Sequence, residues 1–251
     1  MKQYYDFKIE KIKGLSPEEI HLRKKNLELF YQIGFPNKND EDWKFSDLNS
    51  ILSKNFNNIA NNNFLPKEKN IKIIEEFEHN YISLFDGKIV SKDFSYEEKN
   101  KVLIDNFNYK DELIFDNKNS LYILNSALST GGFSLEISKN YKLKKPLIIY
   151  NNFSNSLKET IVNYKNLIIL NENSELNLIN YINNSSRENF MVNTVENIKM
   201  KKNSSLNNIL INNSKCNGYF YKYIKCDLEK NSSLENYLIS SGLKFNKLDI
   251  E

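Results

Sequence analysis

Arginine is nearly missing from this chain of 251 residues, although lysine is plentiful. Only Arg23 and Arg187 are arginines among the 35 basic residues, and the formal net charge is +3. Guanidinium groups make the paired hydrogen bonds that proteins commonly use to recognise phosphates and guanine bases. Because such groups are scarce and the net charge is small, the composition argues against nucleic-acid binding.

Cysteine and histidine are scarce as well, with two residues of each type. Cys216 and Cys226 cannot form a disulfide framework, which favours a reducing compartment. His21 and His79 are far in sequence from both cysteines, so no spacing suits a metal centre. We therefore expect no metal site.

Neither thiol has the sequence context of a reactive group. Cys226 alternates in phase with Ile224 and Leu228, which indicates a small core residue. Cys216 precedes Asn217-Gly218, a turn in which a thiol can be exposed.

Long apolar runs are absent too. Residues 1–14 mix charges with scattered aromatic residues and never form the apolar centre of a signal peptide, and no stretch approaches the length of a membrane span. We therefore expect a cytoplasmic protein with no membrane partner. The fraction of hydrophobic residues, 40%, is sufficient for a packed core.

The common signatures of catalysis and cofactor binding are also missing. The sequence contains no Walker motif, no G-x-G-x-x-G after a strand, no G-x-S-x-G and no H-E-x-x-H. The acidic pairs Glu75-Glu76 and Glu97-Glu98 have no recognisable acid–base partner, and we expect them at the surface. We predict no catalytic, cofactor-binding or metal-binding residues, and no enzymatic activity.

The first part of the chain is expected to be largely helical. A helix is predicted over residues 16–34. Ser16 and Glu19 form a capping box at its start, Pro17 suits its first turn, and Gly34 marks its end. Its apolar stripe is Ile20, Leu27, Phe30 and Tyr31.

Three further elements are predicted before residue 130. A helix from Asp40 to about Leu52 would have Phe45, Leu48 and Leu52 at helical spacing, with Trp43 beside them. Asp86-Gly87 predicts a small hairpin within residues 81–90, and a short helix is expected over residues 120–128.

Beyond Gly131-Gly132 the sequence changes to β-strand patterns. The predicted strands cover residues 133–137, 146–150, 160–170, 176–182, 190–200, 206–211, 219–228, 234–239 and 243–250. In the predicted strand over residues 190–200, one face is formed by Phe190, Val192, Ile198 and Met200. In the strand over residues 219–228, the corresponding face is formed by Phe220, Ile224, Cys226 and Leu228.

An Asn-Ser pair before a strand recurs three times. It occurs at residues 173–174, 203–204 and 231–232, so the repeat lengths are 30 and 28 residues. Each unit contains two strands, which is enough chain for one turn of a β-helix. Asn and Ser suit the corners because Asn tolerates left-handed backbone and both side chains can bond nearby backbone. A sandwich of hairpins is the alternative.

Several segments together resemble the SufD-type iron-sulfur cluster assembly proteins of the SufB/SufD family. The most specific are Arg23, Gly34-Phe35-Pro36 and the EDWKFS motif at residues 41–46. Phe85-Asp86-Gly87, residues 124–128 and residues 145–149 follow in the family's order, and residues 242–250 resemble a stretch midway through its β-helix.

The resemblance implies a mainly β fold, a right-handed β-helix with two long strands per turn behind a small α-helical N-terminal domain. We accordingly place an N-terminal helical (α+β) domain at residues 1–130 and the β-helix core domain at residues 131–251. Family members continue with more β-helix and a C-terminal helical segment that docks an ATPase, and the strand over residues 243–250 would leave a solenoid uncapped. We therefore expect a C-terminally incomplete chain.

The resemblance also implies a non-catalytic scaffold subunit of a SufB-SufC-SufD complex that assembles iron-sulfur clusters. Such a subunit pairs with a SufB-like paralogue through the β-helix and with the SufC-like ATPase through the missing C-terminal segment. The complex handles nascent Fe-S clusters, and ATP through SufC, whereas this chain is expected to bind no cofactor itself. The family's interface cysteine and histidine positions are not assigned to Cys216 or Cys226. Trp43 is expected to be a structural anchor.

Two other functions fit a β-helix. A carbohydrate-active enzyme is disfavoured by the missing signal peptide, by the absence of an aspartate cluster, and by Arg187 being the only arginine in the β-rich half. A structural β-solenoid module or adhesin is disfavoured by the missing export signal and by the N-terminal motif.

Overall fold

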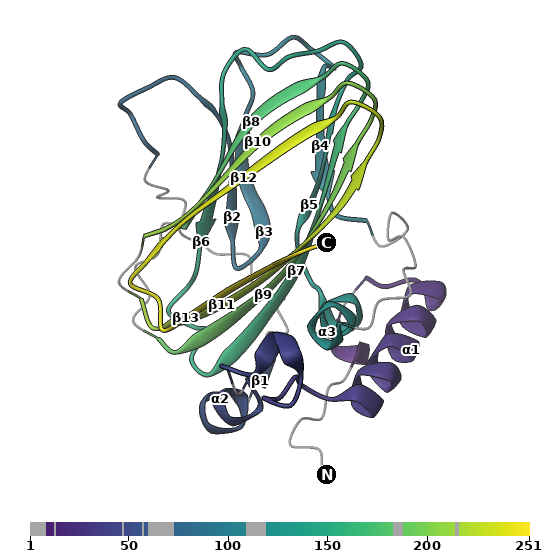
Figure 1. Ribbon diagram of the computed structural model, residues 1–251, viewed down its shortest axis with the longest axis vertical. Coiled ribbons are helices and arrows are strands. Elements are labelled where there is room, and N and C mark those ends of the chain that lie inside the picture. The colour runs from purple at the N-terminus through teal and green to yellow at the C-terminus, as the bar shows by residue number, and fades with distance from the viewer. Residues whose placement is uncertain are drawn as a thin grey trace.

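The computed structural model describes residues 9–12, 14–46, 48–56, 58–59, 73–108, 119–182, 188–213 and 216–251. Over these ranges the protein is mainly β, and its three α-helices lie together beside one of two facing sheets (Figure 1). No helix in this part of the chain has both the length and the hydropathy needed to cross a bilayer.

The strands form two sheets. Sheet A has the order β13-β11-β9-β7-β5-β4, with β1 also pairing with β7, and sheet B has the order β12-β10-β8-β6-β2-β3. The strands are β1 (Asn58–Ile59), β2 (Asn80–Phe85), β3 (Lys88–Asp93), β4 (Val102–Asn106), β5 (Phe133–Ile137), β6 (Leu147–Asn152), β7 (Thr160–Leu170), β8 (Glu175–Ile182), β9 (Phe190–Met200), β10 (Ser205–Asn213), β11 (Gly218–Leu228), β12 (Ser233–Ser241) and β13 (Phe245–Ile250).

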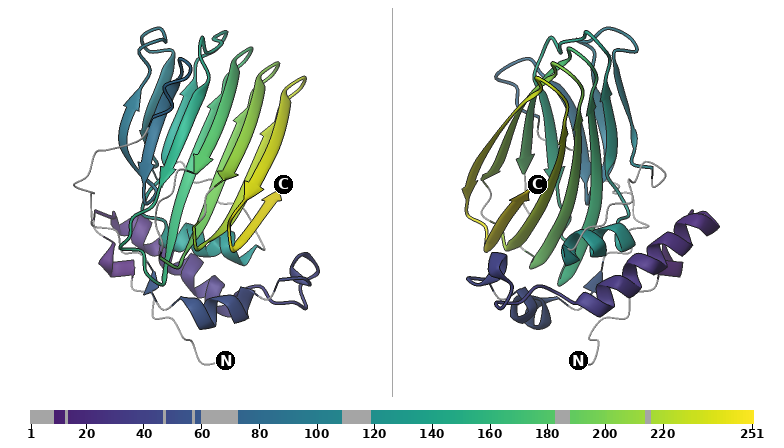
Figure 2. Two further views of the ribbon diagram at one scale, coloured as in Figure 1. Left: turned by 90° about the vertical axis from the view of Figure 1, so that its left-hand side faces the viewer. Right: turned by 45° about the vertical axis from the view of Figure 1, so that its right-hand side comes forward.

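From β6 onward the chain alternates between the sheets. Each strand of sheet B is followed by one of sheet A, and from β7 onward every strand pairs in parallel with the strand two places earlier. The resulting coils are β6–β7, β8–β9, β10–β11 and β12–β13, which stand side by side in Figure 2. The predicted β-helix with two strands per turn is confirmed.

The N-terminal end of the β-helix has antiparallel edges. β2 and β3 form the predicted hairpin, whose turn residues Asp86 and Gly87 have φ angles of 49° and 82°, and β2 pairs in parallel with β6. β4 pairs antiparallel with β5. β2, β3 and β4 therefore belong to the two sheets, and the division of the chain into domains at residue 130 stays a prediction.

The Asn-Ser corners have the backbone that their residue types favour. Asn173, Asn203 and Asn231 have φ angles of 56°, 58° and 59°, in the left-handed region. Each asparagine side chain donates to the asparagine of the preceding coil, which extends the ladder back to Asn140. The serine hydroxyls of the three corners each donate to the carbonyl oxygen three residues earlier. The repeat therefore includes one corner, at Asn140, that has no Asn-Ser pair.

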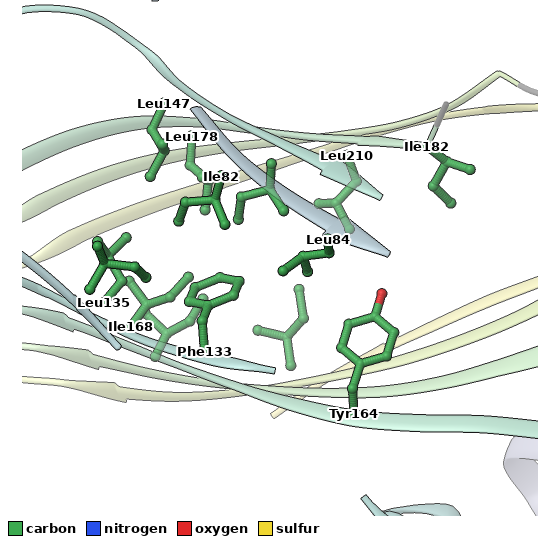
Figure 3. Close-up of a cluster of buried hydrophobic side chains, with 14 of the residues drawn as sticks. Ile82, Leu84, Phe133, Leu135, Leu147, Tyr164, Ile168, Leu178, Ile182 and Leu210 are labelled. Atoms are coloured by element: carbon green, nitrogen blue, oxygen red, sulfur yellow. The ribbon is translucent and has the colours of Figure 1, made fainter. Parts of the chain in front are cut away.

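The main core lies between the sheets. Figure 3 shows Leu147, Leu178 and Leu210 from sheet B facing Leu135 and Ile168 from sheet A. A second cluster lies on the outer side of sheet A, where Ile161, Met191 and Tyr221 pack against the helices. Strands β7, β9 and β11 are consequently buried on both faces along much of their length.

One predicted member of the core face lies outside the core. Leu228 is 50% exposed and Cys226 is only half-buried, whereas Phe220 and Ile224 are buried. The reason is the length of the neighbouring strand, because β13 pairs with β11 only as far as Ile224.

The first helix is confirmed. α1 spans Pro17–Ile33, and both hydrogen bonds of the capping box between Ser16 and Glu19 are present. Leu27 and Phe30 are buried, and Arg23, which the predicted stripe omitted, is buried beside them.

The second predicted helix is wrong in its first half. A short 3₁₀ helix, η2 (Glu41–Trp43), is followed by α2 (Leu48–Asn55), and Phe45 between them is 91% exposed. Trp43 is turned into the outer cluster of sheet A, and Lys44 and Phe45 form a turn instead of a helix. α3 spans Ser120–Leu128, as predicted, and a 3₁₀ turn, η1 (Ile9–Lys11), precedes α1.

Candidate functional site

The EDWKFS motif anchors the N-terminal segment on sheet A. Trp43 is 5% exposed, and its ring stacks on Phe245 of β13 at 6.3 Å between centroids and lies 5.6 Å from the ring of Tyr221 on β11. The Lys247 ammonium lies 4.9 Å from the centre of the indole ring. The predicted role of Trp43 as a structural anchor is consistent with this burial.

Tyr221 links the anchor to α3 and to β13. Its hydroxyl donates to Asp249 Oδ2 at 2.8 Å and accepts from Asn119 Nδ2 at 2.7 Å. Burial, followed by the Asp249 charge, raises the pKa of Tyr221 far above its ordinary value. The phenol therefore stays protonated and acts as a fixed hydrogen-bond donor to Asp249.

Arg23, which also belongs to the resemblance described above, binds the C-terminal end of α3. Its Nη1 donates to the carbonyl oxygens of Ala127 at 3.1 Å and Ser129 at 2.9 Å. Carbonyls in the last turn of a helix have no partner within the helix, and a cation there is favoured by the helix dipole. Arg23 thus joins α1 to α3, a role that local sequence gives no means of predicting.

Two buried asparagines fix α3 on sheet A. Asn125 Nδ2 donates to the carbonyl oxygens of Tyr164 at 2.9 Å and Asn193 at 2.7 Å, and Asn193 Nδ2 donates to the carbonyl oxygen of Leu121 at 2.9 Å. Both side chains are fully buried. The network ties the helix to β7 and β9 with directional bonds, in addition to apolar packing.

A buried lysine completes the contact between α3 and the sheet. Lys165 is fully buried on β7, and its Nζ lies 2.7 Å from Ser126 Oγ and 4.8 Å from the centre of the Tyr122 ring. Gly132 lies directly against this strand, since a Cβ there would stand 1.7 Å from the Lys165 carbonyl oxygen. Only glycine fits that position.

The interior between the sheets also contains charge. Glu196 is fully buried, and its Oε2 lies 3.0 Å from Lys222 Nζ and 3.4 Å from Asn166 Nδ2. Its Oε1 has no hydrogen-bond partner among the described residues. A small cavity of about 40 Å³ beside this group is lined by Asn166, Thr194 and Lys222, among others. Sequence periodicity placed apolar residues on this face and did not reveal the charged pair.

Neither cysteine has the environment of a reactive thiolate. Cys216 is 4% exposed, so the turn at residues 217–218 does not expose it. Cys226 is half-buried, and burial raises its pKa to about 11. A high pKa keeps the Cys226 thiol protonated near neutral pH.

The two histidines and the two cysteines do not come together. His79 is buried, with Nε2 2.8 Å from the Tyr150 hydroxyl, while His21 is exposed on α1. Within the described ranges no group of three or more His, Cys, Asp or Glu side chains is placed to hold a metal ion. That the chain has no metal or cofactor site remains a prediction.

One of the acidic pairs is more than a solvated surface group. Glu97 is half-buried and accepts hydrogen bonds from Asn80 Nδ2 at 2.7 Å, from the Tyr141 hydroxyl at 2.7 Å and from the Lys144 backbone N–H at 3.1 Å. It fixes the loop before β6 and has no general-acid partner in these contacts. Glu75, Glu76 and Glu98 are exposed, as expected.

The comparison with protein families identifies the β-helix. Residues 152–251 match the family described as "SUF system FeS cluster assembly, SufBD core domain". The matched segment starts at the last residue of β6 and includes all of the strands from β7 to β13. No curated protein matches the chain. This part of the chain is therefore similar to the SufBD core domain, and the predicted resemblance to the SufB/SufD family of iron-sulfur cluster assembly proteins is confirmed.

Proposed function

We propose that this chain is a non-catalytic, SufD-type scaffold subunit of the SUF system. It would work in the cytoplasm, pair with a SufB-like paralogue through its β-helix, and act with a SufC-like ATPase while binding no cofactor itself. The match of residues 152–251 to the SufBD core domain carries the assignment to iron-sulfur cluster assembly. The EDWKFS motif, anchored by Trp43 on the same β-helix, supports the SufD type over the SufB type.

The last coil offers a surface for pairing. Tyr237 and Ile239 on the outer face of β12 are 53% and 56% exposed. They continue two apolar rows of sheet B, since Tyr237 is in register with Ile209 and Ile239 with Ile211. Contiguous exposed apolar side chains are typical of protein–protein interaction sites.

Co-purification tests the scaffold assignment. The tagged chain is expressed with SufB-like and SufC-like proteins from one genome, and we expect it to retain the SufB-like paralogue. Retention should survive high salt, because an apolar interface is screened little by ions. The purified chain alone, incubated with iron and sulfide, should develop no cluster absorbance.

A matched pair of substitutions locates the interface. Replacing Tyr237 and Ile239 by serine should reduce retention of the paralogue roughly tenfold, the loss expected when about 1.4 kcal/mol of binding is removed. Leu103→Ser on β4, where the side chain is 48% exposed, is the control and should change nothing. A wild-type chain that fails to bind a paralogue which itself binds the ATPase would sink the proposal.

A further inference from the structure

One dipeptide of the chain combines two residue types that together favour a spontaneous reaction of the backbone. Of the seven glycines, Gly218 is the one that follows an asparagine, Asn217. Glycine has no Cβ to shield its nitrogen, so the Gly218 backbone nitrogen can reach the side-chain amide carbon of Asn217. Asparagine is among the thermolabile residues of proteins. Asn217 is therefore chemically vulnerable, and the fold determines whether it reacts.

The fold leaves this dipeptide accessible to water. Asn217 is exposed and lies in the connection between β10 and β11, outside both strands. The following coil is already in place beside it, since the Lys244 backbone N–H donates to the Gly218 carbonyl oxygen at 3.2 Å. The exposure of Asn217 is therefore a property of this corner within the stack and does not arise because the last coil has no neighbour.

The packing of the core explains why glycine follows Asn217. A Cβ at position 218 would lie 2.4 Å from Phe220 Cε2 and 3.0 Å from Cys216 Sγ. The Phe220 ring is itself held in place, because it packs edge-on against Phe153 and Phe190 with 5.5 and 5.8 Å between ring centroids. A larger residue at position 218 would disturb this packing, so the fold requires the glycine that makes Asn217 reactive.

The corresponding aspartate dipeptide is protected by the fold. Asp86-Gly87 can form the same cyclic intermediate in an unfolded chain. Both Asp86 carboxylate oxygens accept hydrogen bonds from Ser154, at 2.9 Å from its backbone N–H and 2.8 Å from its hydroxyl. A carboxyl group that is held at both oxygens does not turn toward the Gly87 nitrogen, so Asp86 should not react while the chain is folded.

The Asn-Ser corners are protected by hydrogen bonds as well. At these corners the attacking nitrogen would be that of the serine, and the N–H groups of Ser174, Ser204 and Ser232 each donate at 3.1 Å to the carbonyl oxygen three residues earlier. The amide of each corner asparagine is held in the ladder between coils. Both reacting groups are therefore fixed at these corners.

We propose that Asn217 is a modification site at which the folded chain deamidates spontaneously. The Gly218 nitrogen attacks the side-chain amide carbon of Asn217, the bond from that carbon to the amide nitrogen breaks, and ammonia leaves with the proton of the Gly218 nitrogen. Water then opens the resulting succinimide at one of its two carbonyl carbons, which gives aspartate or isoaspartate. The reaction needs no oxidant or reductant.

The isoaspartate product changes the start of β11. Its main chain runs through the former side chain, so one methylene is added directly before Gly218, where β11 begins to pair with Phe190 of β9. One negative charge is added as well. Since β11 also carries Tyr221, against which Trp43 packs, the change should weaken the contact between the helices and sheet A. An isoaspartyl carboxyl methyltransferase is the class of enzyme that would act on this product.

Timed incubation of the full chain at physiological temperature tests the proposal. Peptide mapping by mass spectrometry should find a gain of about 1 Da at Asn217 before it finds one at any other asparagine. Labelled methyl transfer by an isoaspartyl methyltransferase should increase in parallel. The rate should rise about tenfold for each unit of pH, because the attacking nitrogen must lose its proton. In urea, Asp86 and the corner asparagines should react too.

A matched pair of variants locates the reaction. Asn217→Gln keeps an amide but must close a six-membered ring, so it should lower the number of methyl-accepting sites roughly tenfold. Asn155→Gln, at another exposed asparagine, should leave that number unchanged. After the same incubation the melting temperature should fall for the wild-type chain and stay constant for Asn217→Gln. Circular dichroism before incubation confirms that both variants fold.

Three outcomes would overturn the deamidation proposal. They are reaction of the Asn-Ser corners as fast as Asn217 in the folded chain, equal losses of methyl acceptance for Asn155→Gln and Asn217→Gln, and reaction of Asn217 in urea without any in the folded chain. The proposal is separate from the SUF assignment. Failure to bind a SufB-like paralogue leaves this test intact, since no measurement in it depends on that pairing.

Discussion

Glu196 and Lys222 put opposite charges into the interior between the sheets, where Asn166 and Thr194 lie beside them within a mainly apolar core. They lie on adjacent strands, β9 and β11, with 3.0 Å between Lys222 Nζ and Glu196 Oε2; the Glu196 side chain is fully buried and that of Lys222 is 16% exposed. Removing charges from water is unfavourable, and the mutual attraction of the pair compensates for it only while both partners are present. Replacing one partner should therefore destabilise the fold more than replacing both.

We expect Lys222→Met to lower the free energy of unfolding by about 3–5 kcal/mol, since it leaves the buried Glu196 carboxylate without its cation. Glu196→Gln combined with Lys222→Met should recover a large part of that loss. Urea denaturation followed by Trp43 fluorescence measures both. A double variant no more stable than Lys222→Met would contradict the role of the pair.

Cys226 titrates at high pH in the folded chain. Burial raises its pKa to about 11, with a smaller contribution from the Glu196 charge, so the folded state holds the thiol proton more tightly than the unfolded state. Its contribution to stability is therefore present below the unfolded-state pKa and falls as the pH rises through that value towards 11.

Alkylation by iodoacetamide tests this pKa, because only the thiolate reacts. In a Cys216→Ser variant the rate should keep rising steadily to about pH 10 for the folded chain, whereas in urea it should level off above about pH 9. Mass spectrometry after timed quenching gives the rates. A plateau near pH 9 in the folded chain would show that Cys226 has an ordinary pKa.

At the scale of elements, the corners define the coil. Each Asn-Ser corner combines a left-handed asparagine with a serine hydroxyl bound to the carbonyl three residues earlier, and the asparagine amides stack from coil to coil. Asparagine is the residue type, after glycine, that best tolerates this backbone. The corners thus hold the strands in one register through local chemistry.

Asn203→Ala should lower the free energy of unfolding by about 1–2 kcal/mol, because alanine must adopt a left-handed backbone and also loses the amide ladder. Asn207→Ala is the control, since Asn207 makes a similar bond to Asn177 at 3.1 Å from ordinary strand backbone. Asn203→Gly should be milder than Asn203→Ala. Chemical denaturation compares the three, and an equal loss for Asn203→Ala and Asn207→Ala would refute the backbone argument.

Elements with a strong local signal could be predicted from sequence to the residue. α3, β5, β7 and β9 have the predicted bounds, because helix and strand periodicity and the flanking turns depend only on neighbouring residues. Phe45 was misplaced because Trp43 is held by Tyr221 and Phe245, residues that lie far along the chain. Such a long-range contact overrides local helical spacing.

Most of the candidate site could not be predicted from the sequence, again because its contacts join residues far apart in the chain. Arg23 bonds to residues more than 100 positions away, and the Glu196–Lys222 pair joins separate coils. No local pattern marks either contact. The motif around Trp43 could be recognised, but the surface on which Trp43 packs is formed only when β11 and β13 are in place.

At the scale of the whole molecule, the β-helix is a stack in which each coil contacts chiefly its neighbours. Stability in such a stack is approximately a sum over coils and their interfaces. The register between neighbouring coils is fixed by parallel pairing, and Leu206 lies between Leu176 and Leu234. A coil is therefore an interchangeable unit if its length is kept.

Deletion of one complete coil tests this arrangement. Removing Asn203–Lys230 joins Lys202 to Asn231 in the same register, and we expect a folded protein with a β-type circular dichroism spectrum and a lowered melting temperature. A deletion one residue shorter, Asn203–Glu229, shifts the following strands by one position and exposes their core face. It should not fold. Equal folding of the two deletion variants would show that register does not govern the stack.

Because each coil pairs in parallel with the one before it, the β-helix can form while the chain is being synthesised. Every strand from β6 to β13 finds its partner among strands already synthesised, beginning with the β2–β3 hairpin and β5. A nascent chain can therefore complete its coils in the order of translation, each one serving as the template for the next. At the growing end, the newest strand of each of the two sheets then has an open edge.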